Sequence, residues 1–136
     1  MLRVLVVDVG GTHVKVRAGS HAPRKLDSGP TMTAAHMVHA VRAAVGDCPY
    51  DVVSIGYPGV VLHGRPASEP RNLGSGWVGF DFRRAFGRPV KMVNDAAMQA
   101  IGAYRGGRML FLGLGTGLGT ALIVDGALEA MELAHL

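Results

Sequence analysis

The sequence predicts an α/β fold in which strands alternate with helices. Apolar, β-branched runs form predicted strands on both sides of a glycine turn within residues 2–18, and apolar residues at helical spacing follow at 34–45. A further apolar run at 51–56 is typical of a strand in the middle of a sheet covered on both faces. The 136 residues match one ordinary domain, and 49% hydrophobic residues are enough to build a core.

Most of the predicted elements have a clear start or stop. Strands are expected at residues 2–9, 12–18, 24–28, 51–56, 90–93, 109–114 and 118–125, with a loop and a hairpin at 56–64. Helices are expected from Thr31 or Thr33 to Val45, at 80–86, and from Asn94 to Tyr104 or Arg105. Threonine and asparagine are favoured helix N-caps, and glycine at position 46 and at 106–107 ends two of these helices.

Composition narrows the classes of partner. The 14 Lys and Arg residues exceed the 10 Asp and Glu residues, which gives a formal net charge of +4 and favours an anionic ligand. The arginines are scattered without interleaved aromatic residues, so no specific nucleic-acid partner is expected. A single cysteine, Cys48, excludes an intrachain disulfide and favours the cytoplasm. No apolar run reaches the roughly 18 residues of a membrane helix, and no signal peptide is expected.

The first glycine turn combines several groups that suit phosphate, or a metal ion that carries phosphate. It presents an acid at Asp8, two glycines at Gly10 and Gly11, a hydroxyl at Thr12 and a nearby cation at Lys15. Taken alone, the same residues also form an ordinary β-turn. The turn is therefore a candidate phosphate site, and the other motifs of the chain are needed to distinguish it from an ordinary turn.

A second glycine-rich turn lies between the two predicted strands of the last third of the chain. It is no P-loop, because residues 112–120 contain no lysine, and it is no dinucleotide fingerprint, because the glycine spacing differs and a strand follows. Exposed backbone N–H groups and the Thr116 hydroxyl nevertheless suit a phosphate.

Two further pairs of residues each allow two interpretations. Asn94 and Asp95 lie where a predicted strand meets a predicted helix. They are either a helix N-cap or part of a site in which the carboxylate takes a proton from a sugar hydroxyl. Glu132 and His135 are three residues apart, so on a helix they would share a face and bind a metal or a hydroxyl. Fraying at the chain terminus is the alternative for this second pair.

The order of these motifs resembles that of the ROK family (repressors, open reading frames and kinases). The matching motifs are Asp8-x-Gly10-Gly11-Thr12-x-x-Lys15, Gly56-x-Pro58-Gly59, Asn94-Asp95, Leu114-Gly115-Thr116-Gly117-x-Gly119 and Glu132-Leu-x-His135-Leu136. The run from Asn72 to Trp77 is similar to the polyphosphate/ATP-glucokinase branch. The resemblance extends over essentially the whole chain.

The resemblance implies a ribonuclease-H-like lobe of the actin-like ATPase fold. A mixed five-stranded sheet with flanking helices is expected at residues 1–107. A C-terminal β-hairpin from an incomplete second lobe is expected at 108–136. Left uncovered, that hairpin exposes apolar faces and strand edges. We therefore expect it to pair with another copy, as a homo-oligomer, or to fold back on the first lobe.

The resemblance also implies a role for each matched residue. It places Asp8 near the metal and phosphate and makes Asp95 the catalytic base. The first phosphate loop would contain Gly10, Gly11, Thr12 and Lys15, and the second would contain Gly115, Thr116 and Gly117. The sugar hydroxyls would be bound by Asn72, Asn94, Glu132 and His135. The implied cofactor is Mg²⁺ with ATP or polyphosphate. No zinc is expected, because a Cys-x-Cys-Gly cluster is missing from the sequence.

The implied function is transfer of phosphate from ATP or polyphosphate to the 6-hydroxyl of a hexose such as glucose. The later acidic sugar ligand and the adenine pocket of the family have no counterpart here, so a truncated, weakly active or inactive form is expected. The alternatives are a non-catalytic lobe that binds sugar or phosphate, and a lobe that only assembles. A DNA-binding repressor is not expected, because the first strand begins at Leu2.

Overall fold

The computed structural model describes residues 1–114 and 118–131. Five strands form the first sheet: β1 (Val4–Val9), β2 (His13–Ala18), β3 (Arg24–Asp27), β4 (Val52–Tyr57) and β7 (Val90–Asn94). Three strands form a second sheet: β8 (Arg108–Leu114), β9 (Leu118–Val124) and β10 (Ala127–Met131). The described helices are α1 (Ala34–Val45), α2 (Phe82–Phe86) and α3 (Asp95–Ala103), and a short ladder joins β5 (Val61–Leu62) to β6 (Arg65–Pro66).

The first sheet is mixed, with the strand order β3-β2-β1-β4-β7. The three N-terminal strands form an antiparallel meander, whereas β4 runs parallel to both β1 and β7. This confirms the predicted mixed five-stranded sheet and the interior position of β4, between β1 and β7. The parallel strands β1, β4 and β7 therefore end at the same edge of the sheet.

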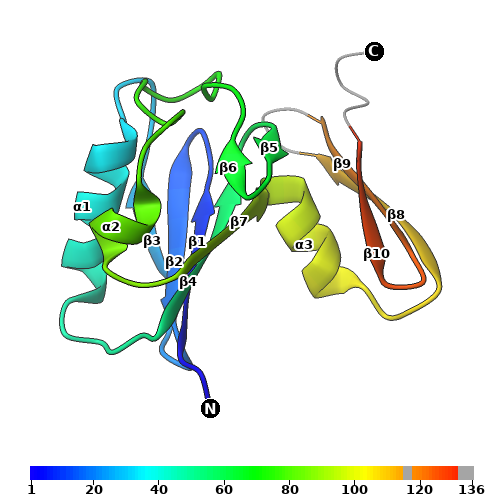
Figure 1. Ribbon diagram of the computed structural model, residues 1–136, viewed down its shortest axis with the longest axis horizontal. Coiled ribbons are helices and arrows are strands. Elements are labelled where there is room, and N and C mark those ends of the chain that lie inside the picture. The colour runs from blue at the N-terminus through cyan, green and yellow to red at the C-terminus, as the bar shows by residue number, and fades with distance from the viewer. Residues whose placement is uncertain (115–117, 132–136) are drawn as a thin grey trace.

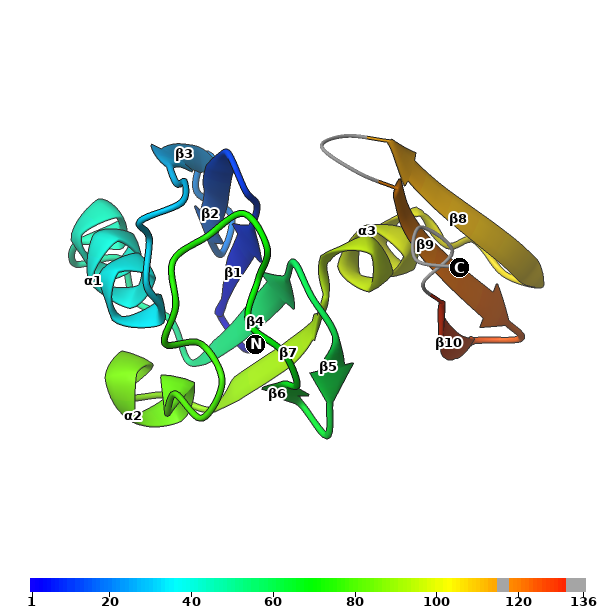
Figure 2. The ribbon, with the colours of Figure 1, turned by 90° about the horizontal axis from the view of Figure 1, so that it is seen from above.

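The elements form layers (Figure 1). Helices α1 and α2 cover one face of the first sheet, α3 covers the other face, and the second sheet lies beyond α3. Because the two faces of the sheet pack against different helices, successive side chains of β1 point alternately to the α1 side and to the α3 side. Leu5, Val7 and Val9 are fully buried in the core that also contains α1, while Asp8 points to the opposite face. Figure 2, seen from above, shows the same separation of α1 and α3 by the first sheet.

The helix ends agree largely with the expected caps. Thr33 is the N-cap of α1, and its side chain accepts a hydrogen bond from the backbone N–H of His36 at 3.1 Å. Gly46 ends the same helix with a positive φ of 54°. Helix α3 ends at Ala103, one or two residues earlier than expected, because Tyr104 already has extended backbone angles.

The second sheet contains the predicted hairpin and one further strand that was not predicted. Asp125 and Gly126 both have positive φ, 49° and 84°, as in the tight two-residue turns that join antiparallel strands. This turn directs β10 back along β9. The sequence Ala-Leu-Glu-Ala-Met at Ala127–Met131 consists of good helix formers, so local propensity gave no strand signal.

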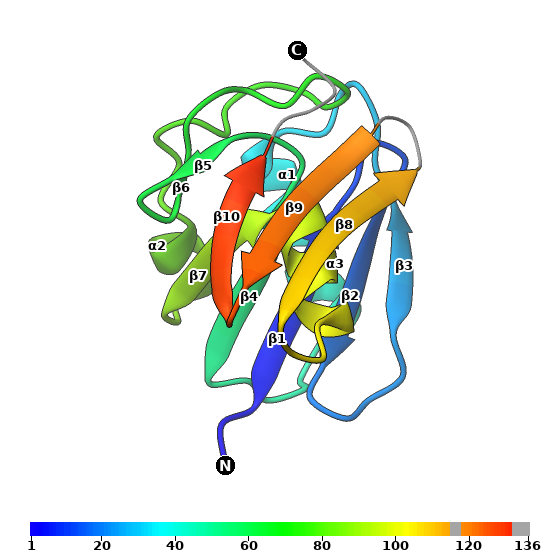
Figure 3. The same cartoon turned by 90° about the vertical axis from the view of Figure 1, so that its right-hand side faces the viewer.

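One face of the second sheet packs on α3, and the other face is uncovered (Figure 3). Ala121 and Ile123 of β9 are buried against Ala100 of α3. On β8, Leu112 and Leu114 are 54% and 88% exposed. The second sheet thus lies back against α3, in line with the fold-back expectation, and pairing with a second copy stays a prediction. No helix of the described part of the chain is long and apolar enough to cross a membrane.

Candidate phosphate and sugar site

Asp8 occupies the part of β1 that faces α3, near the end of the strand. It pairs in register with Lys15 on β2 and with Gly56 on β4. Burial raises the pKa of the Asp8 carboxyl, and the positive charge of Lys15 acts in the opposite direction. A half-buried carboxylate of this kind is stabilised by a cation placed beside it.

Gly56 lets α3 and Asp8 meet at one point of the sheet. A Cβ at Gly56 would lie 2.8 Å from Sδ of Met98 and 3.3 Å from Oδ1 of Asp8. The thioether and the carboxylate therefore occupy the space that a side chain on β4 would fill. The motif Gly56-x-Pro58-Gly59 is thus explained at its first glycine by close packing around Asp8.

The first glycine turn is fixed by its own backbone and by the end of β3. The backbone N–H of Gly10 donates to the His13 carbonyl at 2.9 Å, and a Cβ at Gly10 would lie 2.8 Å from that oxygen. The Ser28 hydroxyl donates to the Gly10 carbonyl at 2.6 Å, and the Ser28 N–H donates to the Thr12 carbonyl at 3.0 Å. The side chain of Thr12 is left exposed at the turn.

Asn72 lies directly on this turn, although it is about sixty residues away in sequence. A Cβ at Gly11 would lie 2.9 Å from the Cβ of Asn72. Asn72 is exposed, so its amide is accessible beside the turn. The structure thus brings together Asn72 and Gly11, which were predicted as sugar-binding and phosphate-binding residues.

Asn94 acts as the N-cap of α3. Its Oδ1 accepts hydrogen bonds from the backbone N–H groups of Ala96 at 3.0 Å and Ala97 at 3.4 Å. Its Nδ2 donates to the Gly59 carbonyl at 2.8 Å, which ties the start of α3 to the loop after β4. The cap interpretation of Asn94 is therefore confirmed, and its contact with a sugar hydroxyl stays a prediction.

Asp95 is the first residue of α3 and follows directly on β7. Its Oδ1 accepts a hydrogen bond from the backbone N–H of Ala96 at 2.8 Å. Because β1 and β7 both run parallel to β4, Asp8 and Asp95 stand at the same edge of the sheet. Open α/β sheets bind their ligands at this carboxyl edge.

The second sheet reaches the site through Gly119 at the start of β9. A Cβ at Gly119 would lie 2.8 Å from the Cβ of Ala96 in the first turn of α3. The strand that follows the second glycine turn thus packs closely beside Asp95. The predicted site residues Gly115, Thr116, Gly117, Glu132 and His135 lie outside the described residues.

Some contributors to this site carried little signal in the sequence. Ser28 directly follows β3 and Met98 lies within α3, and only the fold brings them to the glycine turn and to Asp8. Within residues 1–114 and 118–131, no group of three or more His, Cys, Asp or Glu residues gathers to hold a metal ion. Asp8 nevertheless fits Mg²⁺, which is commonly held by one or two carboxylates together with substrate phosphates.

Comparison with solved structures connects this arrangement to known proteins. The inorganic polyphosphate/ATP-glucomannokinase from Arthrobacter sp. strain KM matches 100% of this chain with a TM-score of 0.83 and 28% sequence identity. A ROK family glucokinase from Streptomyces griseus, solved with glucose and AMPPNP, matches 97% of the chain with a TM-score of 0.75 and 27% identity. The chain has the fold of the N-terminal part of ROK-family sugar kinases.

Other comparisons define the extent of this match. A ROK hexokinase from Thermus thermophilus shares the fold with a TM-score of 0.71 at 22% identity. The chain spans 64% of the Arthrobacter glucomannokinase and 47% of the Streptomyces ROK glucokinase. No protein-family model matches the chain, and a search of curated proteins gave no match. The resemblance predicted from the motifs is thus confirmed at the level of the fold and the ROK sugar-kinase structures.

Proposed function

We propose that the chain forms the substrate-binding part of a ROK-type sugar kinase that transfers phosphate from ATP or polyphosphate to the 6-hydroxyl of a hexose such as glucose. The observation that carries this proposal is the position of Asp8 and Asp95 at one edge of the first sheet, beside α3. The glucomannokinase and the ROK glucokinase that share the fold support the same reaction class.

Asp95 is the proposed general base. Its carboxylate accepts the proton of the sugar 6-hydroxyl while the hydroxyl oxygen forms a bond to the terminal phosphorus of the donor. The bond between that phosphorus and its bridging oxygen breaks, and the leaving phosphate retains the electron pair. The position of Asp95 at the N-terminus of α3 supports this role, because partial positive charge there favours the ionised carboxylate.

Asp8 and the first glycine turn are the proposed phosphate side of the site. Asp8 would hold Mg²⁺, which would offset negative charge on the phosphates of the donor. Gly10, Gly11 and Thr12 would face the phosphates, with the ammonium group of Lys15 nearby. The half-buried Asp8 carboxylate supports the assignment, since its raised pKa shows that the fold itself stabilises the negative charge poorly.

The sugar and the remaining phosphate contacts complete the proposal. Asn72 would bind a sugar hydroxyl, and Asn94 would do so from the start of α3. Glu132 and His135 are assigned to sugar hydroxyls, and Gly115, Thr116 and Gly117 to the second phosphate loop, from sequence alone. The proposal also treats residues 1–107 as a first lobe and 108–136 as the start of a second, in a cytoplasmic homo-oligomer.

A coupled assay for glucose 6-phosphate, with ATP and polyphosphate in parallel, tests the proposal. We expect Asp95→Asn to lower the rate by about 10²–10⁴-fold, the usual contribution of a general base. Asp47→Asn serves as the control, because Asp47 is exposed in the loop after α1. Equal rates for Asp95→Asn and the wild type would exclude the assigned base. Absence of turnover with both donors would agree with the inactive form of the kinase as well as with the non-catalytic binding alternative, and calorimetry with glucose then tests binding.

A further inference from the structure

The segment between β6 and α2 is attached to the core at several points. At its beginning, the Tyr57 hydroxyl donates a hydrogen bond to the Ser68 carbonyl at 2.6 Å. At its end, the ring of the fully buried Trp77 packs at a tilted angle against that of Tyr57, with the ring centres 5.8 Å apart. In the middle, the backbone N–H of Gly74 donates to the Met32 carbonyl at 2.9 Å. The segment therefore follows a defined path over the sheet.

Glu69 joins the two ends of this segment. Its Oε2 accepts a hydrogen bond from the backbone N–H of Trp77 at 3.1 Å, and its Oε1 accepts one from Val78 at 3.2 Å. One carboxylate thus binds two successive N–H groups and closes residues 69–78 into a ring. A charged acceptor forms stronger hydrogen bonds than a neutral one, so this closure is a substantial constraint on an otherwise irregular segment.

Tyr57 of β4 attaches the closed ring to the first sheet. Burial, together with the nearby charge of Glu69, raises the pKa of the Tyr57 hydroxyl above its ordinary value. Like any tyrosine, Tyr57 is protonated at neutral pH, and its hydroxyl donates to the carbonyl of Ser68, next to Glu69 in the chain. The closed ring and its attachment to β4 act on the same short stretch of backbone.

The tip of the closed segment reaches the candidate site. Asn72 lies within residues 69–78, and its Cβ is 2.9 Å from the position that a Cβ on Gly11 would occupy. The next residue, Leu73, is 8% exposed and packs into the core, while Asn72 itself is exposed. The core contacts of Leu73 and Gly74 hold the backbone after Asn72, and the closed ring fixes the two ends of the segment, so we expect opening of the ring to loosen the position of the Asn72 amide beside the first glycine turn.

We infer that Glu69 is a positioning residue of the sugar subsite, because its carboxylate closes residues 69–78 and so holds Asn72 against the first glycine turn. The inference rests on the proposed function, in which Asn72 binds a hexose hydroxyl. Glu69 does not touch the sugar and acts through Asn72. An amide suits this ligand class, since it both donates and accepts hydrogen bonds and so pairs with a hydroxyl.

Glucose affinity, measured by calorimetry, tests the inference with four variants. Glu69→Ala is expected to weaken binding about tenfold, as the loss of a charge-assisted contact allows. Glu69→Gln is expected to be intermediate, because its amide oxygen still accepts one N–H whereas its NH₂ group accepts none. If Glu69 acts through Asn72, the double variant Glu69→Ala/Asn72→Ala binds no more weakly than Asn72→Ala alone.

Glu129→Ala is the matched control, since Glu129 is an exposed glutamate on β10. Glucose affinity of Glu69→Ala equal to that of the wild type would overturn the inference, as would full additivity with Asn72→Ala. Hydrogen exchange separates this failure from failure of the proposed function. If the wild type binds no glucose, the proposed function and the inference are both overturned. Faster exchange of the Trp77 amide in Glu69→Ala would then assign the Glu69 carboxylate to loop closure alone.

Discussion

The two sheets differ in how much of their surface the chain itself covers. The five-stranded sheet has helices on both faces, and residues such as Val7 and Ile55 are completely buried. In the three-stranded sheet, Ala121 and Ile123 are buried on the face against α3, whereas Leu112 on the opposite face is 54% exposed. Because hydrophobic stabilisation grows with the apolar area removed from water, the first sheet is expected to dominate the stability of the chain.

Helix α3 is the element that both sheets share. Met98 contacts the first sheet at Gly56, and Ala96 contacts the second sheet at Gly119. Because Ala96 and Gly119 are small, the second sheet approaches the backbone of α3 closely. The position of the second sheet therefore depends on one short helix, α3, which also presents Asp95.

Removing buried isoleucine side chains from the two cores is expected to produce the largest difference. Truncation of a buried isoleucine to alanine costs roughly 2–5 kcal/mol, and more where the surroundings cannot collapse into the cavity. We expect a loss of about 4 kcal/mol for Ile55→Ala and about 2 kcal/mol for Ile123→Ala, which lies in the smaller cluster. Urea unfolding measures both values. An equal or larger loss at Ile123 would contradict the proposed difference between the sheets.

A pair of glycine substitutions tests the contact between α3 and the second sheet. Gly119→Ala places a methyl group 2.8 Å from the Cβ of Ala96, and we expect a loss of about 1–3 kcal/mol from this overpacking. Gly102 lies within α3 with nothing within 4 Å of an added Cβ, so Gly102→Ala is expected to gain about 0.5–1 kcal/mol. Thermal unfolding compares the two variants. Stabilisation by Gly119→Ala would exclude the close packing of β9 on α3.

A smaller effect is expected from Asp8→Asn, and its sign depends on pH. Since burial raises the folded-state pKa of Asp8, ionisation of this group costs stability once the pH exceeds its unfolded value, near 3.9. The cost grows until the pH passes the folded-state pKa and is constant above it. Asp8→Asn should therefore stabilise the protein at pH 7 and not at about pH 3. Thermal unfolding at both pH values provides the comparison, and destabilisation at pH 7 would indicate a structural role for the charge.

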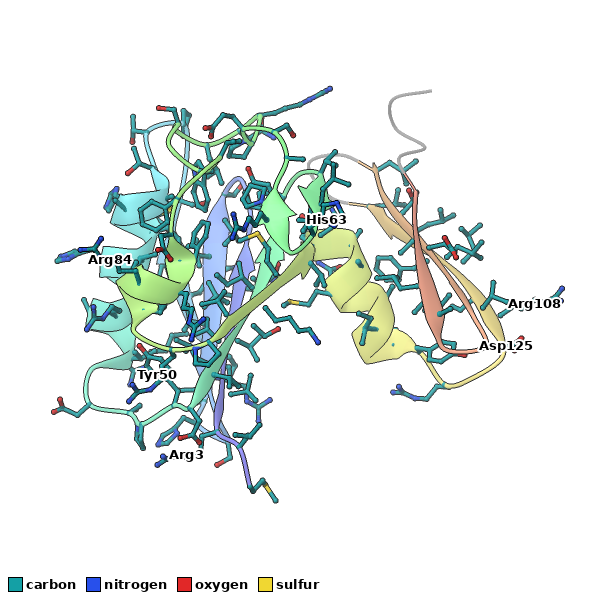
Figure 4. All side chains as sticks on the ribbon, in the orientation of Figure 1. Arg3, Tyr50, His63, Arg84, Arg108 and Asp125 are labelled. Atoms are coloured by element: carbon teal, nitrogen blue, oxygen red, sulfur yellow. The ribbon has the colours of Figure 1, made fainter. Side chains whose placement is uncertain are left out.

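A carboxyl group with the opposite pKa shift, Asp51, lies at the other end of the first sheet, next to Arg3 (Figure 4). There, Arg3 forms an exposed ion pair with Asp51 at 2.9 Å, and the hydrogen bonds from Arg3 lower the pKa of the Asp51 carboxyl. This contact stabilises the fold at neutral pH and is lost as the pH falls through the folded-state pKa. The pKa values of Asp8 and Asp51 shift in opposite directions because burial outweighs the charge of Lys15 at Asp8, whereas hydrogen bonds from Arg3 outweigh burial at Asp51.

The parts of the fold that the sequence predicts are those determined by neighbouring residues. The strands around Gly10, the Thr33 cap and the start of α3 at Asn94 all follow from local turn and cap chemistry. Strand β10 escaped prediction because Ala127–Met131 favours a helix locally and is extended only through pairing with β9.

In the candidate site too, local motifs could be predicted from the sequence, whereas contacts between distant elements could not. The motif at residues 8–12 predicts Asp8, Gly10 and Gly11 as site residues, and of the two interpretations of Asn94 the structure confirms the helix cap. The contacts of Gly56 with Met98, Gly11 with Asn72 and Gly119 with Ala96 could not be predicted, since each joins elements far apart in sequence. Glu69 was missed because an isolated glutamate in an irregular segment is usually a solvated side chain.

Titration of Mg²⁺ and AMPPNP into the protein, followed by calorimetry, examines the central claim that the α3 face of the first sheet is a phosphate site. We expect the wild type and Asp47→Asn to bind with equal affinity, and Asp8→Asn to bind at least about tenfold more weakly because one carboxylate contact is lost. Because Asp8→Asn is expected to be more stable than the wild type at neutral pH, its thermal unfolding curve separates weaker binding from unfolding. Equal affinity of Asp8→Asn and the wild type would contradict the claim.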